Sequence, residues 1–478
     1  MVSRVIIDLS MRTVAHPQQL TIANDKEGPV DSTVSSSNHL PPRQGDFARR
    51  NGGTLVVHTP QSAQTVLIIR AIDTLRREHV EEEWFRHLPS RHGHSQALDM
   101  SAKAIIAACA YNRSVPKLTS SDCRQALALA INALQTSIQR SNGQPDDDIL
   151  ASTALLAPLE GVINQHGIPT RLHVQGLAAV LTARPVSYPV SQLARDILDW
   201  YAFESAVLAC LHDIPSPFES VARVYFSNDR MGHSDSDRAQ LKALSTEIFL
   251  RMPRLVRLVR SLRLQASPQT QPLLDAISLK ESLLEMQDPE TEQQFLRTVE
   301  VRPSNIPDAA WHASQSLHFA CAKDFEALVS YWQGRLSLLR LERRLHDLLA
   351  SNVVQADSTY ERHTFIRPVP GPRVAEMSTL VKNIIMCSEY ARTVVLIRQH
   401  HLFAYALLAV WGVTLDVPEI FTHGQDGQWK DALSDLLLRR VNSALAAEPP
   451  FTIEDMDVAA CVLVGGQPLG RFAKLYGI

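Results

Sequence analysis

The sequence lacks several features that would indicate a metal centre or a nucleic-acid-binding surface. Its 478 residues contain six cysteines, at positions 109, 123, 210, 321, 387 and 461, and no two of them are closer than fourteen residues. Local zinc motifs built on Cys-x2-Cys pairs are therefore excluded. The formal net charge is −3, so no overall positive field is present to attract phosphate backbones.

Long hydrophobic runs are also missing. The longest, "LFAYALLAVWGVTL" at 402–415, is shorter than the roughly 18 residues that a membrane span needs, and it predicts a buried core helix. The N-terminus has no apolar run that resembles a signal peptide. We therefore expect a soluble, intracellular protein whose thiols are reduced.

Sequence motifs of known catalytic chemistry are absent as well. There is no Gly-x-Ser-x-Gly, no His-Glu-x-x-His, no phosphate loop, and the glycine cluster "VGGQPLG" at 464–470 has the wrong spacing for a dinucleotide fingerprint. His87, His92 and His94 form the densest histidine group, with Asp99 as the nearest acid, and are typical of solvated loop residues. We expect no catalytic residue, no cofactor and no bound metal, and a protein that is not an enzyme.

Helical periodicity dominates what is present. Apolar residues recur at helical spacing in 127–138 and 328–339, and Ser121 and Asp122 are candidate caps for the first of these helices. Pro215 and Pro217 should stop a helix that covers 193–211. Strand signals are sparse, and "TLVVHT" at 54–59 is the best of them. The pattern predicts an all-α fold: a large multi-helix domain at 61–478, preceded by a flexible, disordered N-terminal tail at 1–60 that is rich in Ser, Pro and Gly.

The stretch "DDDILASTALLAPLEGVINQ" at 146–165 has two interpretations. Three carboxylates at the start of a helix favour the positive end of its dipole. An Asp-Asp-x-x-Asp magnesium motif of the terpene-cyclase type would need a third ligand, but Leu150 and Ala151 occupy those positions. The helix cap is the favoured interpretation.

Arginines recur at intervals of three in "LRMPRLVRLVRSLRL" at 250–264. Arg254, Arg257 and Arg260 could form weak, non-specific phosphate contacts on one side of a helix. The alternative, which we favour, is a solvated face whose arginines pair with acids of neighbouring helices.

Four segments in order resemble the helical C-terminal regulatory domain of fungal zinc-cluster transcription factors. The segments are "DDDILASTALLAPLEGVIN", "HVQGLAAVLTARP", "LARDILDWYAFESAVLACLHDIPSPF" and "SLHFACAKDFEALVSYWQGRLSLLRL". In the second segment, His173, Gly176, Leu181 and Arg184 match the family's run; we interpret His173 as part of a helix start and Gly176 as a close packing contact. The resemblance covers roughly residues 65–478.

The resemblance implies a helical, nuclear regulator of transcription, and many members of the family control secondary-metabolite gene clusters. The six-cysteine finger of the family is missing, so no DNA contact can be transferred. The chain would then act through protein contacts, as a homodimer or with a finger-bearing transcription factor, with indirect or weak DNA binding and no membrane association. Two alternatives stay open: a helical enzyme of secondary metabolism, terpene-cyclase-like or tailoring, and a gene product whose upstream exon encoded the finger.

Overall fold

The computed structural model describes the residues 83–112, 119–163, 171–184, 191–221, 236–265, 270–305, 314–355, 371–394, 397–421, 428–445 and 449–475. In these ranges the chain is almost entirely helical, and the only strands are two short ones that form a hairpin. The all-α prediction is therefore confirmed. The predicted tail at 1–60 and the predicted strand at 54–59 lie outside the described residues.

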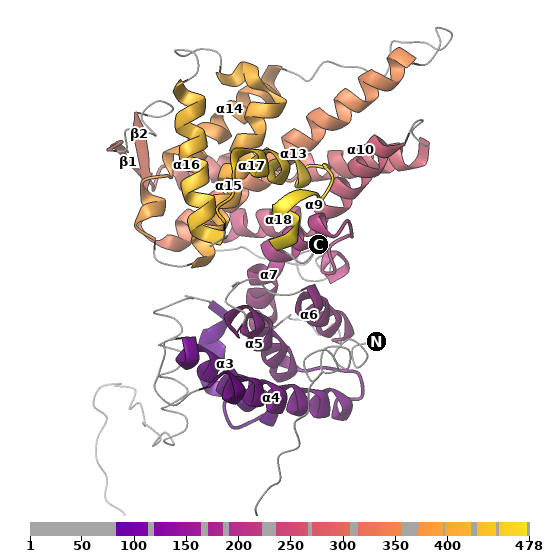
Figure 1. Cartoon of the computed structure of the whole chain (residues 1–478), viewed down its shortest axis with the longest axis vertical. Coiled ribbons are helices and arrows are strands. Elements are labelled where there is room, and N and C mark those ends of the chain that lie inside the picture. Colours follow the sequence, from indigo (N-terminus) through magenta and orange to yellow (C-terminus); the bar gives the residue numbers. More distant parts are fainter. Residues whose placement is uncertain are drawn as a thin grey trace, which may run out of the picture.

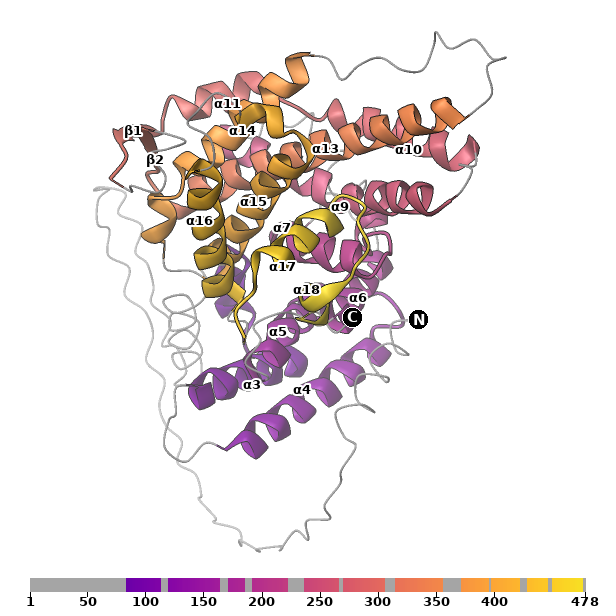
Figure 2. The same ribbon diagram turned by 45° about the horizontal axis from the view of Figure 1, so that its top comes forward.

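A first group of helices forms the lower part of Figure 1. It comprises η1 (Glu83–His87), η2 (Pro89–Arg91), α3 (Gln96–Asn112), α4 (Ser120–Arg140), α5 (Asp147–Ile163) and α6 (Arg171–Ala183). Helix α3 packs against both α4 and α5, and α5 also contacts α6. Helix α7 (Gln192–Leu211) then runs from this group towards the second one (Figures 1 and 2).

The second group holds the remaining elements. These are α9 (Asp237–Leu264), α10 (Thr270–Leu284), α11 (Pro289–Leu296), β1 (Glu300–Pro303), β2 (Gln315–His318), α13 (Ala322–Gln355), α14 (Gly371–Met386), η4 (Tyr390–Arg392), α15 (Ile397–Asp416), η5 (Pro418–Phe421), α16 (Gln428–Leu445), α17 (Ile453–Val462) and α18 (Gly470–Leu475). The strands are antiparallel, with Glu300 opposite His318. Helix α13 packs against α9, α14 and α15, which places it at the centre of the group.

The apolar interior consists of two clusters that meet at α7. Leu198 and Tyr201 of α7 belong to the cluster of the first group, whereas Phe203 and Cys210 belong to that of the second. Helix α7 is buried on nearly every side, as expected for a helix that is apolar all round and lies between two packed layers. Leu250 of α9 also lies in the first cluster, so the two groups share α7 and one residue of α9.

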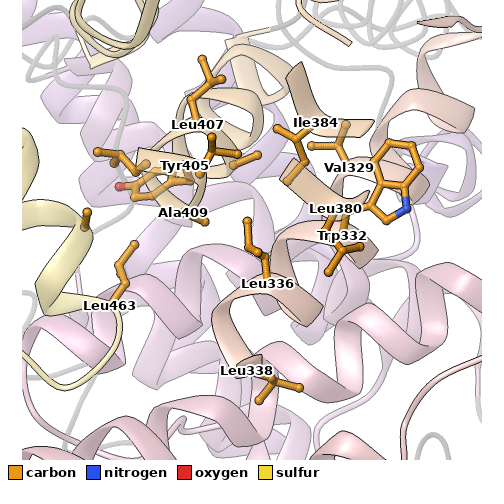
Figure 3. Close-up of a cluster of buried hydrophobic side chains, with 14 of the residues drawn as sticks. Val329, Trp332, Leu336, Leu338, Leu380, Ile384, Tyr405, Leu407, Ala409 and Leu463 are labelled. Carbon is orange, nitrogen blue, oxygen red and sulfur yellow. The ribbon is translucent and has the colours of Figure 1, made fainter. Parts of the chain in front are cut away.

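The core of the second group is built around α13, and Figure 3 shows part of it. Trp332 and Leu336 of α13 lie in one cluster with Ile384 of α14 and Leu407 of α15, and all four side chains are buried. Helices α13 and α15 are buried on most faces in their central turns. The predicted core helix at 402–415 is thus confirmed, because it forms most of α15.

Several local predictions can be compared with the structure. The apolar stripe of 127–138 is buried as predicted, but the helix begins earlier than expected. Thr119, not Ser121, is the N-cap: its hydroxyl accepts from the backbone N–H of Asp122, while the Asp122 carboxylate accepts from the Thr119 backbone N–H at 2.8 Å. Helix α7 ends at Leu211, so the predicted stop before Pro215 is confirmed. The hairpin at 300–318 was not predicted, since its outer strand is fully exposed and shows no alternation.

Because α7 belongs to both clusters, the two helix groups should unfold together. We expect hydrogen-exchange mass spectrometry at increasing urea concentrations to give the same unfolding midpoint for peptides of α3–α5 and for peptides of α13–α15. Leu198→Ala should lower both midpoints equally and reduce the free energy of unfolding by about 2–5 kcal/mol. Leu129→Ala is the control, because that side chain is 52% exposed and its loss should cost less than about 0.5 kcal/mol. Separate midpoints for the two groups would contradict the coupling.

Candidate functional site

The three arginines expected to contact phosphate lie in different environments. Arg260 is only 2% exposed, so it cannot present its guanidinium to a phosphate at the surface, and for this residue the prediction needs correction. Arg254 is on the surface with its side chain 43% exposed, and it pairs with Glu219 at 3.3 Å, as the alternative interpretation expects. Arg257 is exposed. Because a spacing of three residues rotates successive side chains around the helix, Arg260 points into the core while Arg257 stays at the surface.

Arg260 connects several elements of the second helix group by donating hydrogen bonds to their backbone carbonyls. Its Nε donates to Gly466 O at 2.7 Å, and its Nη2 donates to Cys210 O at 3.0 Å and to Val462 O at 3.1 Å. Its Nη1 donates to Asp213 Oδ1 at 2.7 Å. Two of these carbonyls belong to the last turns of α7 and α17, where helical carbonyls lack intrahelical partners. Arg260 therefore joins the carboxyl ends of two helices.

A second arginine site contains two residues of α13, Arg340 and Arg344, which share the carboxylate of Asp416. Arg340 Nε donates to Asp416 Oδ2 at 2.8 Å, and Arg344 Nη2 donates to Asp416 Oδ1 at 2.9 Å. Burial would raise the pKa of Asp416, but the two guanidinium groups outweigh it and lower this pKa. Burial, in turn, lowers the pKa of Arg340 despite the adjacent carboxylate. Two positive charges thus face one negative charge inside the protein.

These two arginine sites meet at the 461–466 turn, which follows α17. Arg344 Nη1 donates to Val464 O at 3.4 Å, and Arg263 Nη1 donates to Gly465 O at 3.4 Å. Gly465 has φ +88°, and a Cβ at that position would lie 2.8 Å from Val259 of α9. The glycine cluster that has the wrong spacing for a nucleotide fingerprint therefore allows this turn to approach α9 closely.

The Arg340 guanidinium occupies the space beside Gly412 of α15. A Cβ at Gly412 would lie 2.0 Å from the Arg340 guanidinium carbon. By contrast, a Cβ at Gly176 of α6 would meet no atom within 4 Å. The close packing contact predicted for Gly176 is thus wrong, whereas Gly412 of α15 lies directly against the Arg340 side chain of α13.

A further buried guanidinium, that of Arg335, fixes the turn between α10 and α11. It donates to Leu284 O at 2.9 Å, to Gln287 Oε1 at 3.0 Å and to Glu376 Oε1 at 2.6 Å. Nearby, Trp332 Nε1 donates to Glu292 Oε1 at 2.6 Å. Burial raises the pKa of Glu292 even though it accepts this hydrogen bond.

The acidic stretch at the start of α5 is confirmed as a cap and is also an ion-pair centre. Asp146 Oδ1 accepts from the Ile149 backbone N–H at 2.9 Å, as expected of an N-cap. Asp147 accepts from Arg91 at 2.6 Å, from Arg184 at 2.5 Å and from Ser191 at 2.9 Å. Burial opposes ionisation of Asp147, yet these partners lower its pKa.

The histidines near the N-terminal end of the described chain bind separate acids. His87 Nε2 lies 3.1 Å from Asp196 Oδ2, and His92 Nδ1 lies 2.6 Å from Asp99 Oδ1. In the described ranges, His, Cys, Asp and Glu side chains form no group of three that could hold a metal ion. The helices of these ranges are also too short or too polar to span a membrane.

Comparison of the chain with family models, with curated proteins and with solved structures finds no match in any of the three. The site therefore has to be interpreted from its own geometry. Its central residues, Arg335, Arg340, Arg344 and Asp416, were not singled out from the sequence. Arg335 and Arg340 lie inside the apolar run of 325–341, and a charged side chain at a buried helical position needs an internal partner; this is the signal that could have identified them. Arg344 and Asp416 lie outside that run.

The Gly412–Arg340 contact generates a stability prediction. Gly412→Ala should force the guanidinium away from Asp416 and lower the free energy of unfolding by about 1–3 kcal/mol. Gly176→Ala is a matched control on another helix: with open space at its Cβ, it should leave stability unchanged or raise it by about 0.5–1 kcal/mol. Urea denaturation of both variants measures the difference. Equal stability of the two variants would show that Arg340 moves aside without cost.

The lowered pKa of Asp147 generates a pH prediction. A carboxyl whose folded-state pKa is lowered stabilises the fold above its unfolded pKa of about 3.9 and loses that contribution as the pH falls through the folded value. Asp147→Asn should therefore lower the free energy of unfolding by about 1.5–3 kcal/mol at pH 7, and the difference from wild type should shrink below about pH 4. Asp435→Asn, at an exposed position of α16, is the control. A difference that stays constant from pH 7 to pH 3 would contradict the assignment.

Proposed function

We propose that this protein is a fungal transcription regulator that acts in the nucleus through protein contacts and controls a secondary-metabolite gene cluster. The proposal rests on the resemblance to the regulatory domain of zinc-cluster transcription factors. In that model the chain is not an enzyme, and it reaches DNA through a finger-bearing partner or as part of a homodimer with weak DNA contacts of its own.

The observation that carries the proposal is that three of the four segments bearing the resemblance contact one another. The acid-led segment forms α5 and the next segment forms α6, and Arg184 after α6 bonds Asp147 at the start of α5. The third segment supplies α7, whose Tyr201 hydroxyl donates to Ala154 O of α5 at 2.8 Å. Contacts between segments that are separated in sequence support a shared helical scaffold.

The arrangement of arginines supports indirect DNA binding. Arg260 faces the interior and Arg254 already pairs with Glu219, so within the 254–260 series Arg257 is the exposed member with the least engaged charge. A single exposed guanidinium can contact one phosphate, but one such contact does not select a DNA sequence. Sequence selection would have to come from another protein.

The proposal is tested by tethering the full chain to a heterologous DNA-binding domain and measuring a reporter in a fungal host. We expect reporter transcription to change relative to the DNA-binding domain alone. Leu198→Ala, which weakens the core, should reduce that change in proportion to the loss of folded protein. A reporter level identical to that of the DNA-binding domain alone would count against a regulatory role.

Purified protein provides a second readout. At 150 mM salt with random competitor, it should not select a promoter fragment over random duplex, and any weak binding should have an affinity of roughly 10⁻⁴ to 10⁻⁶ M. Arg254→Ala with Arg257→Ala should reduce that binding, whereas Arg124→Ala, an exposed arginine on α4, should reduce it less. Selection of one sequence by the pure protein would refute partner-dependent DNA binding.

A further inference from the structure

A group of arginines lies where η4 meets the C-terminal half of α16. Helix α16 packs along α15 (Figure 1), and its Arg440 is half-buried. Arg440 Nη2 donates to the backbone carbonyl of Ser388, just before η4, at 3.1 Å. Arg392 of η4 and Arg439 of α16 are exposed, and their positive charges act on Arg440. These three arginines therefore form one basic cluster, the 392–440 cluster.

No acid balances the charge of this cluster in the part of the chain that the structure describes. Neither Arg392 nor Arg440 forms an ion pair there, and burial together with the two neighbouring guanidinium groups lowers the pKa of Arg440. The half-buried Arg373, by contrast, pairs with Glu376 at 3.3 Å. A partly buried positive charge without a counter-charge is costly unless an anion binds it.

The surroundings of the cluster add donors and no negative charge. Glu389, the acid nearest to η4 in the sequence, accepts instead from the backbone and side-chain N–H groups of Asn305, at 3.1 and 3.2 Å. The pKa of His400 is lowered by burial and by Arg440, so the first turn of α15 lies near the cluster. That turn has no acidic residue, and a helix start favours an anion. Ser388 is fully buried, and its hydroxyl has no hydrogen-bond partner among the described residues.

We propose that the 392–440 cluster binds the dianion of a phosphate monoester. A guanidinium presents paired N–H donors that match two phosphate oxygens. Three guanidinium groups exceed the single charge of a carboxylate, so a dianion compensates them better. A nucleic-acid backbone would need a longer basic surface, and the net charge of −3 provides no wider positive field. The site does not depend on the regulatory role proposed above.

Equilibrium dialysis of the full-length protein against radiolabelled inorganic phosphate tests the site. In a chloride buffer of physiological ionic strength, we expect one bound phosphate for each chain. Arg392→Gln should weaken this binding about tenfold, because it removes one charge-assisted contact. Arg124→Gln, at an exposed arginine of α4, is the matched control and should bind phosphate as wild type does. Absence of binding to wild type, or equal binding by Arg392→Gln, would overturn the proposal.

A stability measurement separates anion binding from a structural role of Arg392. Without phosphate, Arg392→Gln removes one of several like charges, so its urea midpoint should equal or exceed that of wild type. The midpoint of Arg124→Gln should be unchanged. A lower midpoint for Arg392→Gln would show that Arg392 supports the fold through a partner, and the cluster would then not be a free anion site.

Competition identifies where the phosphate group comes from. Methyl phosphate and a short peptide with one phosphoserine should both displace the labelled phosphate, whereas the same peptide without the phosphate group should not. Half-displacement by the phosphopeptide at a concentration about tenfold lower than that of methyl phosphate identifies a phosphorylated segment of a partner protein as the ligand. Equal potency identifies a free phosphate ester. Displacement by the unphosphorylated peptide, or by neither phosphate compound, would contradict a phosphate monoester site.

Discussion

Burial of guanidinium groups is the constraint on which the second helix group depends. A guanidinium has five N–H donors and cannot lose its charge, so each buried arginine requires several acceptors in fixed positions. Arg260 finds three of its acceptors in backbone carbonyls, at Cys210, Val462 and Gly466. Such bonds specify where the ends of α7 and α17 must lie relative to α9, which apolar contacts alone do not define.

The same constraint explains how the ends of helices are positioned around α9 and α13. Apolar side chains supply most of the favourable free energy, but they tolerate sliding of one helix along another. The arginines on α9 and α13 each select one position, because a shift of one turn would leave a buried charge without partners. The result is a central pair of helices to which the C-terminal segment is attached at defined points.

The sequence predicted the fold class well and the interior of the candidate site poorly. Period-3.6 patterns placed the stripe of 127–138 and the core helix of 402–415 correctly, because local repetition of apolar residues reports which face is buried. Arg340 and Asp416 are far apart in sequence, so no local pattern could pair them. Arg260 was assigned to the surface because arginine is rarely buried, although Val256 and Val259 flank it on the apolar side of the helix.

The fit of Arg340 against Gly412 also has an evolutionary consequence. The guanidinium uses the volume that a side chain at 412 would fill, so the two positions cannot vary independently. A lineage that replaced Arg340 with a small residue would open a cavity beside α15 and leave Asp416 with one arginine instead of two. In such a lineage, a larger side chain at position 412 would fill the cavity and become favourable. Positions 340, 412 and 416 should therefore covary as a triplet, whereas position 176, with open space around it, should drift freely between glycine and alanine.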